Sequence, residues 1–167
     1  MKNGYKENRT WSDIFIRQLK QIAGLYTISV GNPIQDMEEG TDLITLSAVP
    51  KRIACRVRRP EYYPRYRYDI TIRAIVKSGA PTEFQKLMTE EDDTWQHIYI
   101  YCFSNTANKI VGYHVIDIPE LRSWAYDLIA QGTLPDNTPN NDGTWFKAFD
   151  TRRMPIKCII HSTEITS

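Results

Sequence analysis

Apolar and polar side chains alternate along residues 52–59 and again along residues 66–76. In the first segment Ile53, Cys55 and Val57 fall on one side, and Arg52, Ala54, Arg56 and Arg58 fall on the other. A period of two residues is that of a β-strand with one face buried and the other exposed. The two segments therefore predict neighbouring strands of one sheet, joined by an arginine- and tyrosine-rich loop around Pro60 and Pro64.

The remaining pattern predicts a single α+β domain, residues 1–167, with a mixed, mainly antiparallel central sheet flanked by helices. Helices are expected over Ser12–Leu25, over Thr82–Met88, where Thr82 and Gln85 form a capping-box pattern, and from Pro119 to Gly132. Further strands are expected over Thr41–Val49, Trp145–Asp150 and Ile156–His161, with a hairpin formed by Trp95–Ser104 and Lys109–Ile118. Short connections favour adjacent pairing, so residues 41–49, 52–59 and 66–76 should be consecutive neighbours.

Cysteine usage and hydropathy predict a cytoplasmic protein. The three cysteines, Cys55, Cys102 and Cys158, are far apart and lie in apolar or alternating segments, which favours buried thiols in a reducing compartment. No apolar run approaches the roughly 18 residues that cross a bilayer, and the first residues are polar, so no membrane contact is expected. The three histidines have no acid or cysteine at ligand spacing and are predicted to be packed or surface residues.

The formal net charge of +1 hides a basic stretch. Between Lys51 and Arg73 the sequence has eight basic residues (Lys51, Arg52, Arg56, Arg58, Arg59, Arg65, Arg67, Arg73) and two acids, Glu61 and Asp69. Guanidinium groups match phosphates, and tyrosine rings stack on bases. The sequence therefore predicts nucleic-acid contact by Arg56, Arg58, Arg59, Arg65, Arg67, Arg73, Tyr63 and Tyr66. The alternative is a solvated sheet face on which arginine stems cover tyrosines.

An acid at the start of one strand, a cationic strand after it and a helix opening with another acid make a further pattern. These elements are Asp42, the strand with Arg56 and Arg58, and the helix with Glu83 and Lys86. Over roughly Ser12–Ile118 this resembles the PD-(D/E)XK, or restriction-endonuclease-like, nuclease superfamily. The resemblance implies a Mg²⁺ ion held by Asp42 and Glu83, with Arg58 or Lys86 steadying the phosphate, DNA as substrate and a homodimer. It also implies a phage or mobile-element origin.

The sequence departs from that family at two places. Thr41-Asp42 replaces the Pro-Asp pair, and Arg56-Val57-Arg58 occupies the E-x-K slot. Arginine neither ligates a metal nor acts as a base. Two function classes therefore stay open: a Mg²⁺-dependent nuclease whose second acid has moved to Glu83, and a non-catalytic accessory protein that binds nucleic acid or a protein partner. A structural component of a larger assembly is a third. No G-x-S-x-G, Walker or G-x-G-x-x-G motif supports acyl hydrolysis or nucleotide chemistry.

Overall fold

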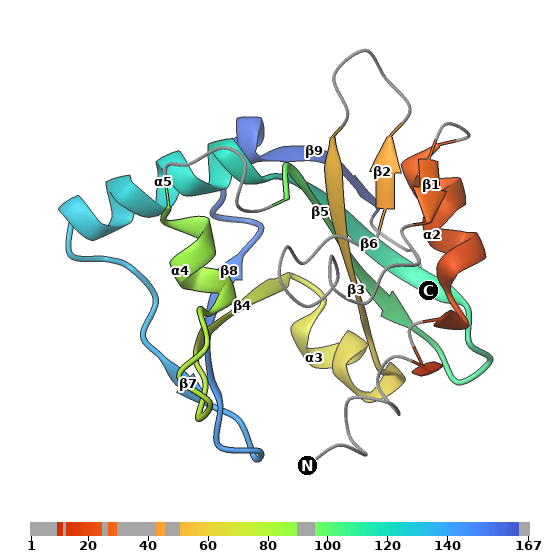
Figure 1. Ribbon diagram of the computed structural model, residues 1–167, viewed down its shortest axis with the longest axis horizontal. Helices are drawn as coiled ribbons and strands as arrows, with labels where there is room; N and C mark the ends of the chain where they lie inside the picture. Colours follow the sequence, from red (N-terminus) through yellow and green to blue (C-terminus); the bar gives the residue numbers. More distant parts are fainter. Residues whose placement is uncertain are drawn as a thin grey trace.

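A computed structural model describes residues 10–11, 13–24, 27–29, 43–45, 51–89 and 96–163. The fold is α+β, as predicted (Figure 1). Its elements, in chain order, are α2 (Ile16–Ala23), β1 (Thr27–Ser29), β2 (Leu43–Thr45), β3 (Arg52–Arg58), the 3-10 turn η2 (Pro60–Tyr62), α3 (Tyr63–Tyr66), β4 (Asp69–Ile75), α4 (Glu83–Leu87), β5 (Ile98–Ser104), β6 (Ile110–Asp117), α5 (Ile118–Ala130), β7 (Thr138–Pro139), β8 (Trp145–Asp150), η3 (Ile156–Cys158) and β9 (Ile159–Thr163).

The larger of the two sheets is mixed and mainly antiparallel, as predicted. Its strand order is β1-β2-β3-β5-β6-β9. β3 and β5 run parallel, with Cys55 opposite Ile100, whereas the other neighbouring pairs are antiparallel. Because a parallel pair needs a long crossover, everything between β3 and β5 has to leave this sheet and return.

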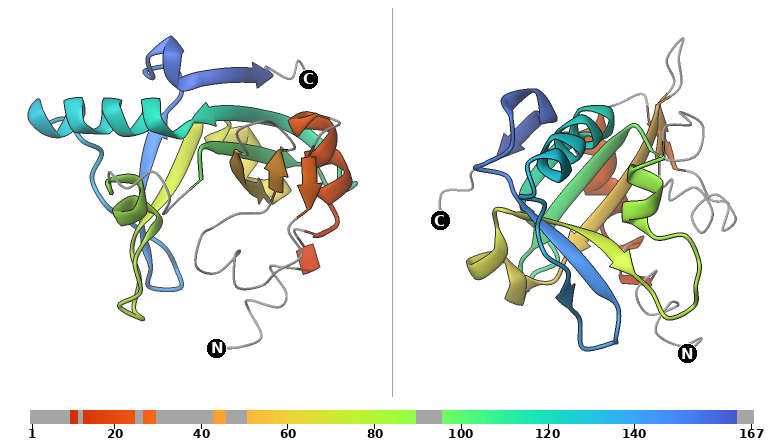
Figure 2. Two further views of the ribbon diagram at one scale, coloured as in Figure 1. Left: turned by 45° about the horizontal axis from the view of Figure 1, so that its top comes forward. Right: turned by 90° about the vertical axis from the view of Figure 1, so that its left-hand side faces the viewer.

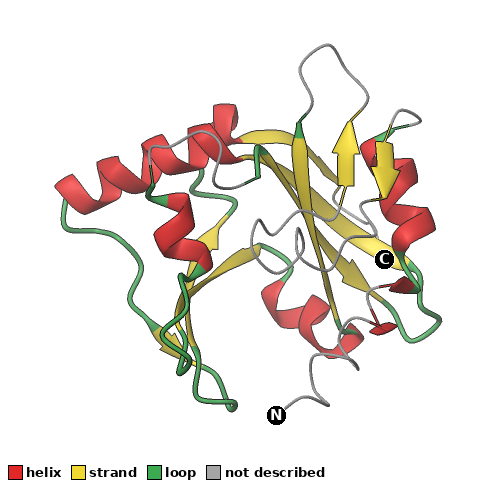
Figure 3. Cartoon of the chain, in the orientation of Figure 1, coloured by secondary structure: helices red, strands yellow, loops and turns green. Residues whose placement is uncertain are grey.

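The smaller sheet takes one of its strands, β4, from that crossover, and it corrects one prediction. Its order is β4-β8-β7, all antiparallel (Figure 3). The pairing of β2 with β3 is confirmed, but the expectation that residues 66–76 pair with residues 52–59 is wrong. The chain turns through two short helical segments after Arg58, and β4 then pairs with β8, where Ile70 lies opposite Phe149.

Two hydrophobic clusters cover the two faces of the large sheet. Figure 2 shows the elements that contribute to them from two further sides. On one face, Tyr99, Tyr101 and Phe103 contact one another edge-to-face, with neighbouring ring centroids 5.6–5.7 Å apart. They form one cluster with apolar residues of the small sheet, α4 and α5. On the other face, Phe15 and Leu19 of the N-terminal helix pack on Ile53, Ile100 and Cys102. Alternate residues of β5 thus contribute to both clusters, which explains why this strand is buried along most of its length.

Local sequence signals determine where some of the helices and strands begin. The capping box of α4 is confirmed: Thr82 Oγ1 accepts from Gln85 N (3.1 Å), and Gln85 Oε1 accepts from Thr82 N (2.8 Å). Three other boundaries differ from the predictions. The loop expected after residue 59 contains η2 and α3, the third strand begins at Asp69, and the last strand begins at Ile159 because residues 156–158 form a 3-10 turn.

All three cysteines lie in the described part of the chain as thiols. Cys102 and Cys158 are buried, as predicted, and Cys55 is half-buried. Burial raises the pKa of Cys102 and raises that of Cys158 to about 11. Within the described ranges, no helix is both long enough and apolar enough to cross a membrane.

Candidate nucleic-acid interface

Prolines shape the segment that connects the two sheets. Pro60 and Pro64 stand in the first turns of η2 and α3, where a missing backbone N–H costs no hydrogen bond and the fixed φ suits a helix. The resulting helical spacing brings Tyr62 and Tyr66 together, with ring centroids 6.2 Å apart. A stretch expected to be an irregular loop is therefore a short ordered platform between the end of β3 and the start of β4 (Figure 1).

Guanidinium groups lie over the aromatic rings of this platform. Three pairs lie within the segment: Arg58 over Tyr62 (4.1 Å from carbon ζ to the ring centroid), Arg65 over Tyr66 (5.2 Å) and Arg67 over Tyr68 (5.0 Å). Arg59 lies 5.2 Å from the ring of Trp11. Such cation–π contacts contribute roughly 0.5–1 kcal/mol at exposed sites and hold flexible side chains in place. We call this set the arginine–tyrosine surface: Arg58, Arg59, Arg65, Arg67, Tyr62, Tyr66 and Tyr68.

The chain after β8 extends this surface. Arg152 lies 4.6 Å from the Tyr68 ring, and Thr151 N donates to the Tyr68 carbonyl oxygen (2.8 Å). Asp150 holds Arg152 in a two-pronged contact, from Nε to Oδ1 (2.9 Å) and from Nη2 to Oδ2 (2.7 Å). Sequence reasoning missed Arg152 and Trp11. The adjacent Arg152-Arg153 pair after a predicted strand was the available signal for the first.

Two acids at this junction have opposite pKa shifts. The hydrogen bonds from Arg152 lower the pKa of Asp150. Asp69 lies directly opposite Asp150 across β4 and β8, and burial, together with that neighbouring negative charge, raises its pKa. Asp150 therefore largely neutralises the positive charge of Arg152. The side chains of Arg59, Arg65 and Arg67 are exposed to solvent.

A buried histidine supports the surface from below. His114 Nε2 lies 2.8 Å from the Arg67 carbonyl oxygen, and Nδ1 lies 2.7 Å from Ser162 Oγ. Because a carbonyl oxygen only accepts, the proton is assigned to Nε2, and Nδ1 accepts from the serine hydroxyl. Burial lowers the pKa of His114, which favours this neutral form. His114 was predicted to be a packed or surface residue; it is packed, and its packing fixes the backbone at Arg67.

Tyr63, one of the predicted nucleic-acid contacts, is turned the other way. Its ring packs edge-on against Phe103, with centroids 5.6 Å apart, at the margin of the core. Tyr66, by contrast, is 37% exposed. Ring contacts therefore link Arg58 and Arg65 through Tyr62 and Tyr66. Arg67 lies against Tyr68, Arg59 lies against Trp11, and Tyr63 has a packing role.

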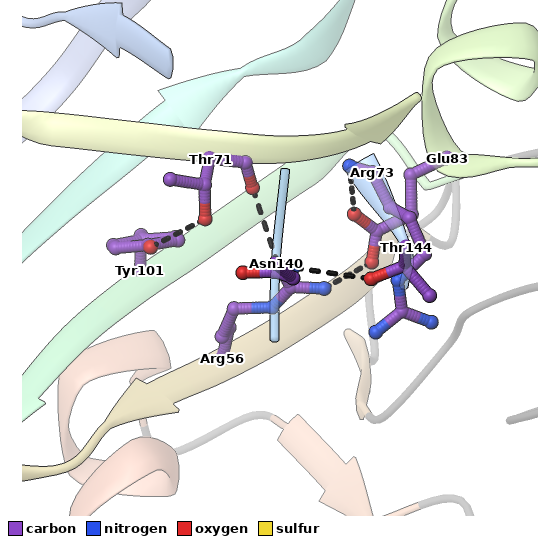
Figure 4. A network of polar contacts seen from close by, with 7 residues as sticks. All are labelled: Arg56, Thr71, Arg73, Glu83, Tyr101, Asn140 and Thr144. Atoms are coloured by element: carbon purple, nitrogen blue, oxygen red, sulfur yellow. Dashed lines mark hydrogen bonds and ion pairs between the residues drawn. The ribbon is translucent and has the colours of Figure 1, made fainter. Parts of the chain in front are cut away.

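Two further predicted residues, Arg56 and Arg73, belong to a different network (Figure 4). Arg56 forms an ion pair with Glu83, and its Nη1 donates to the Thr71 carbonyl oxygen (3.2 Å). The other oxygen of Glu83, Oε2, accepts from the backbone N–H of Arg73 (2.8 Å). The network thus joins β3 and β4, neighbours in sequence that lie in different sheets, to the first turn of α4.

Of the two ligands of the Mg²⁺ centre that the nuclease resemblance implies, the structure describes only Glu83, and the centre stays a prediction. Asp42 lies outside the described residues, and both oxygens of Glu83 are occupied by hydrogen-bond donors, one of them the cation Arg56. Within the part of the chain that the structure describes, no three His, Cys, Asp or Glu side chains are grouped to hold a metal. Of the residues predicted to steady a phosphate, Lys86 is half-buried on α4 and Arg58 lies over Tyr62.

Comparison with protein-family models, curated proteins and solved structures finds no match to this chain.

Proposed function

We propose that the protein binds nucleic acid, DNA first of all, through the arginine–tyrosine surface. The observation that supports this most is the gathering of exposed guanidiniums on an ordered platform. Residues 58–68 contain four arginines and one acid, Glu61, a local net charge of +3 (4 − 1). Guanidiniums match phosphate geometry, and contacts to phosphates supply most of the sequence-independent affinity for nucleic acid.

A salt titration tests this proposal. The logarithm of the DNA association constant falls with the logarithm of salt concentration by about 0.9 per duplex phosphate contacted. Replacing Arg65 and Arg67 together by alanine should weaken binding and make this slope shallower by about 1.8, if each contacts one phosphate. Both side chains are exposed, so the fold should survive.

The matched control removes two exposed cations at the far end of β4, Arg73 and Lys77. It should leave the slope nearly unchanged, and it also tests the prediction that Arg73 contacts nucleic acid. If both double variants lost the same DNA affinity, the overall charge of the protein, and not this surface, would govern binding. No retention on DNA at low salt would overturn the proposal and favour an acidic protein partner.

The nuclease resemblance adds the hypothesis of a restriction-endonuclease-like fold that cleaves DNA as a homodimer. The antiparallel pairing of β2 with β3, and the approach of Glu83 to Arg56 in the E-x-K slot, are in keeping with it. The same ion pair, however, puts a fixed cation where that family binds its metal, and a fixed cation repels Mg²⁺. We therefore propose a non-catalytic binding protein.

A cleavage assay separates the two hypotheses. Wild type, Asp42→Ala and Glu83→Ala are incubated with plasmid DNA in Mg²⁺ and in Mn²⁺. No metal-dependent cleavage is expected from any of the three. Cleavage by the wild type that both substitutions abolish would establish the nuclease, and sedimentation of the wild type tests the homodimer.

A further inference from the structure

The aromatic rings next to the exposed arginines already have partners within the protein. Carbon ζ of Arg58 lies 4.1 Å from the centroid of the Tyr62 ring, and that of Arg65 lies 5.2 Å from the Tyr66 ring. The Tyr68 ring has two such neighbours, Arg67 at 5.0 Å and Arg152 at 4.6 Å. The fourth tyrosine of the segment, Tyr63, packs on Phe103. A base that stacked on one of the first three rings would compete with a guanidinium for that ring.

The arginines can bind an anion without leaving their rings. A guanidinium contacts an aromatic ring through its flat face, and its N–H donors point outward along its edge. The edge is the part that matches the two oxygens of a phosphate. The rings therefore serve the arginines as supports: they hold the guanidiniums in position, and the guanidiniums present their donors to solvent.

Base edges of a duplex are read within its grooves, and arginine, which can pair with guanine, has to be carried into a groove to do so. Residues 58–68 include no Asn or Gln, the amide side chains that pair with adenine in the major groove. The platform also projects no long helix or two-stranded ribbon that could enter a groove, because η2 spans Pro60–Tyr62 and α3 spans Tyr63–Tyr66.

We infer that the arginine–tyrosine surface recognises the phosphodiester backbone and neither stacks on nor reads the bases. The inference rests on the proposed nucleic-acid function and specifies the chemistry that the surface recognises. Strands with the same number and spacing of phosphates should bind alike, whatever bases they carry.

Two single-stranded oligonucleotides of equal length test this, one with a mixed base sequence and one made entirely of abasic sites. Their dissociation constants for the full-length protein are measured by fluorescence anisotropy at low salt. Stacking on aromatic side chains strengthens binding by at least about fivefold per base. Backbone recognition therefore predicts that the dissociation constants for the two strands differ by less than that factor. Tighter binding of the base-bearing strand beyond it would overturn the inference and leave the proposed function standing. Failure of both strands to bind would overturn the inference, and failure to retain duplex DNA at low salt as well would overturn the proposed function too.

A tyrosine variant makes the test independent of absolute affinity. Tyr66→Leu removes a ring that is 37% exposed and supports Arg65. If the ring is a support, the substitution changes the affinity for both strands by the same factor, as Arg65→Ala should. If the ring stacks on a base, Tyr66→Leu weakens only the base-bearing strand, and the inference is overturned.

Discussion

Glu83 is a metal ligand in the nuclease hypothesis and the ion-pair partner of Arg56 in the structure, and Glu83→Gln should destabilise the fold. The carboxylate pairs with Arg56 and accepts the backbone N–H of Arg73 at 2.8 Å. Glutamine keeps the size but loses the charge, and its amide nitrogen, itself a donor, then has to face one of the two donors. The exposed fractions of the Arg56 and Glu83 side chains are 23% and 27%.

The expected cost lies between two known limits. Exposed ion pairs contribute about 0–1 kcal/mol, whereas removing one partner of a fully buried pair costs about 3–5 kcal/mol. A pair that keeps about a quarter of its exposure falls between them, so we expect a loss of about 2 kcal/mol in the free energy of unfolding. For a chain of this length that lowers Tm by roughly 4–8 °C.

Urea unfolding measures this against a matched control. Glu120→Gln makes the same chemical change in the pair with Lys157 (2.8 Å), where the side chains are 40% and 55% exposed. Its effect should stay within about 0.5 kcal/mol. In a double-mutant cycle, Arg56→Met combined with Glu83→Gln should cost less than the sum of the single substitutions, because the double variant leaves no unpaired half of the pair.

Two results would refute this reasoning. The first is a Glu83→Gln variant as stable as the wild type, or single costs that simply add in the cycle. The second is a rise in the Tm of the wild type in millimolar Mg²⁺ that Glu83→Gln abolishes. A ligand that binds only the folded state raises stability, so this second result would restore Glu83 as a metal ligand.

Two other predictions concern the core and pH. Thr71 Oγ1 and Tyr101 OH lie 2.8 Å apart and are buried, so Thr71→Val and Tyr101→Phe should each cost about 1–2 kcal/mol in urea unfolding, and the double variant less than their sum. Strictly additive costs would contradict a direct bond. The pKa of His114 is lowered from its ordinary value of 6.5, so the unfolded chain takes up more protons as pH falls below about 6.5. The free energy of unfolding should fall in that range with a limiting slope of about 1.4 kcal/mol per pH unit. His114→Asn should lose this pH dependence, and the control His161→Asn, at an exposed site, should keep it. A slope unchanged in His114→Asn would assign it to other groups.

Local sequence patterns predicted the secondary structure correctly where it depends on one segment alone. The alternation in residues 52–59 predicted β3, the strand-like run over residues 145–150 predicted β8, and the side-chain pattern of Thr82 and Gln85 predicted the start of α4. The same local reasoning failed at Pro60 and Pro64. Proline was treated there as an interruption, although at the first position of a helix it favours the helix.

The pairings that build the site are long-range, and the local period does not specify them. The alternation along residues 66–76 predicts a strand but not whether its neighbour is β3 or β8. That choice is made by apolar residues elsewhere, such as Phe149 opposite Ile70. Glu83 was identified correctly as the acid that opens α4, but its partner Arg56 is 27 positions away and became apparent only once β3, β4 and α4 were assembled. Arg152 meets Tyr68 for the same reason.

The arginine–tyrosine surface is ordered because both sheets hold it. Ser104 Oγ of β5 donates to the Arg58 carbonyl oxygen (2.9 Å), and His114 of β6 contacts that of Arg67 (2.8 Å), so the large sheet fixes both ends of the arginine segment. Thr151 N, just after β8 of the small sheet, donates to the next carbonyl oxygen, that of Tyr68 (2.8 Å). A phosphate that binds here meets guanidiniums that already lie on rings and a backbone that is already fixed, so little ordering entropy opposes binding. Exposed arginines on an irregular loop would bear the same charge but would lose that entropy on each contact. The position of the surface between the two sheets therefore matters as much to the proposed function as its charge.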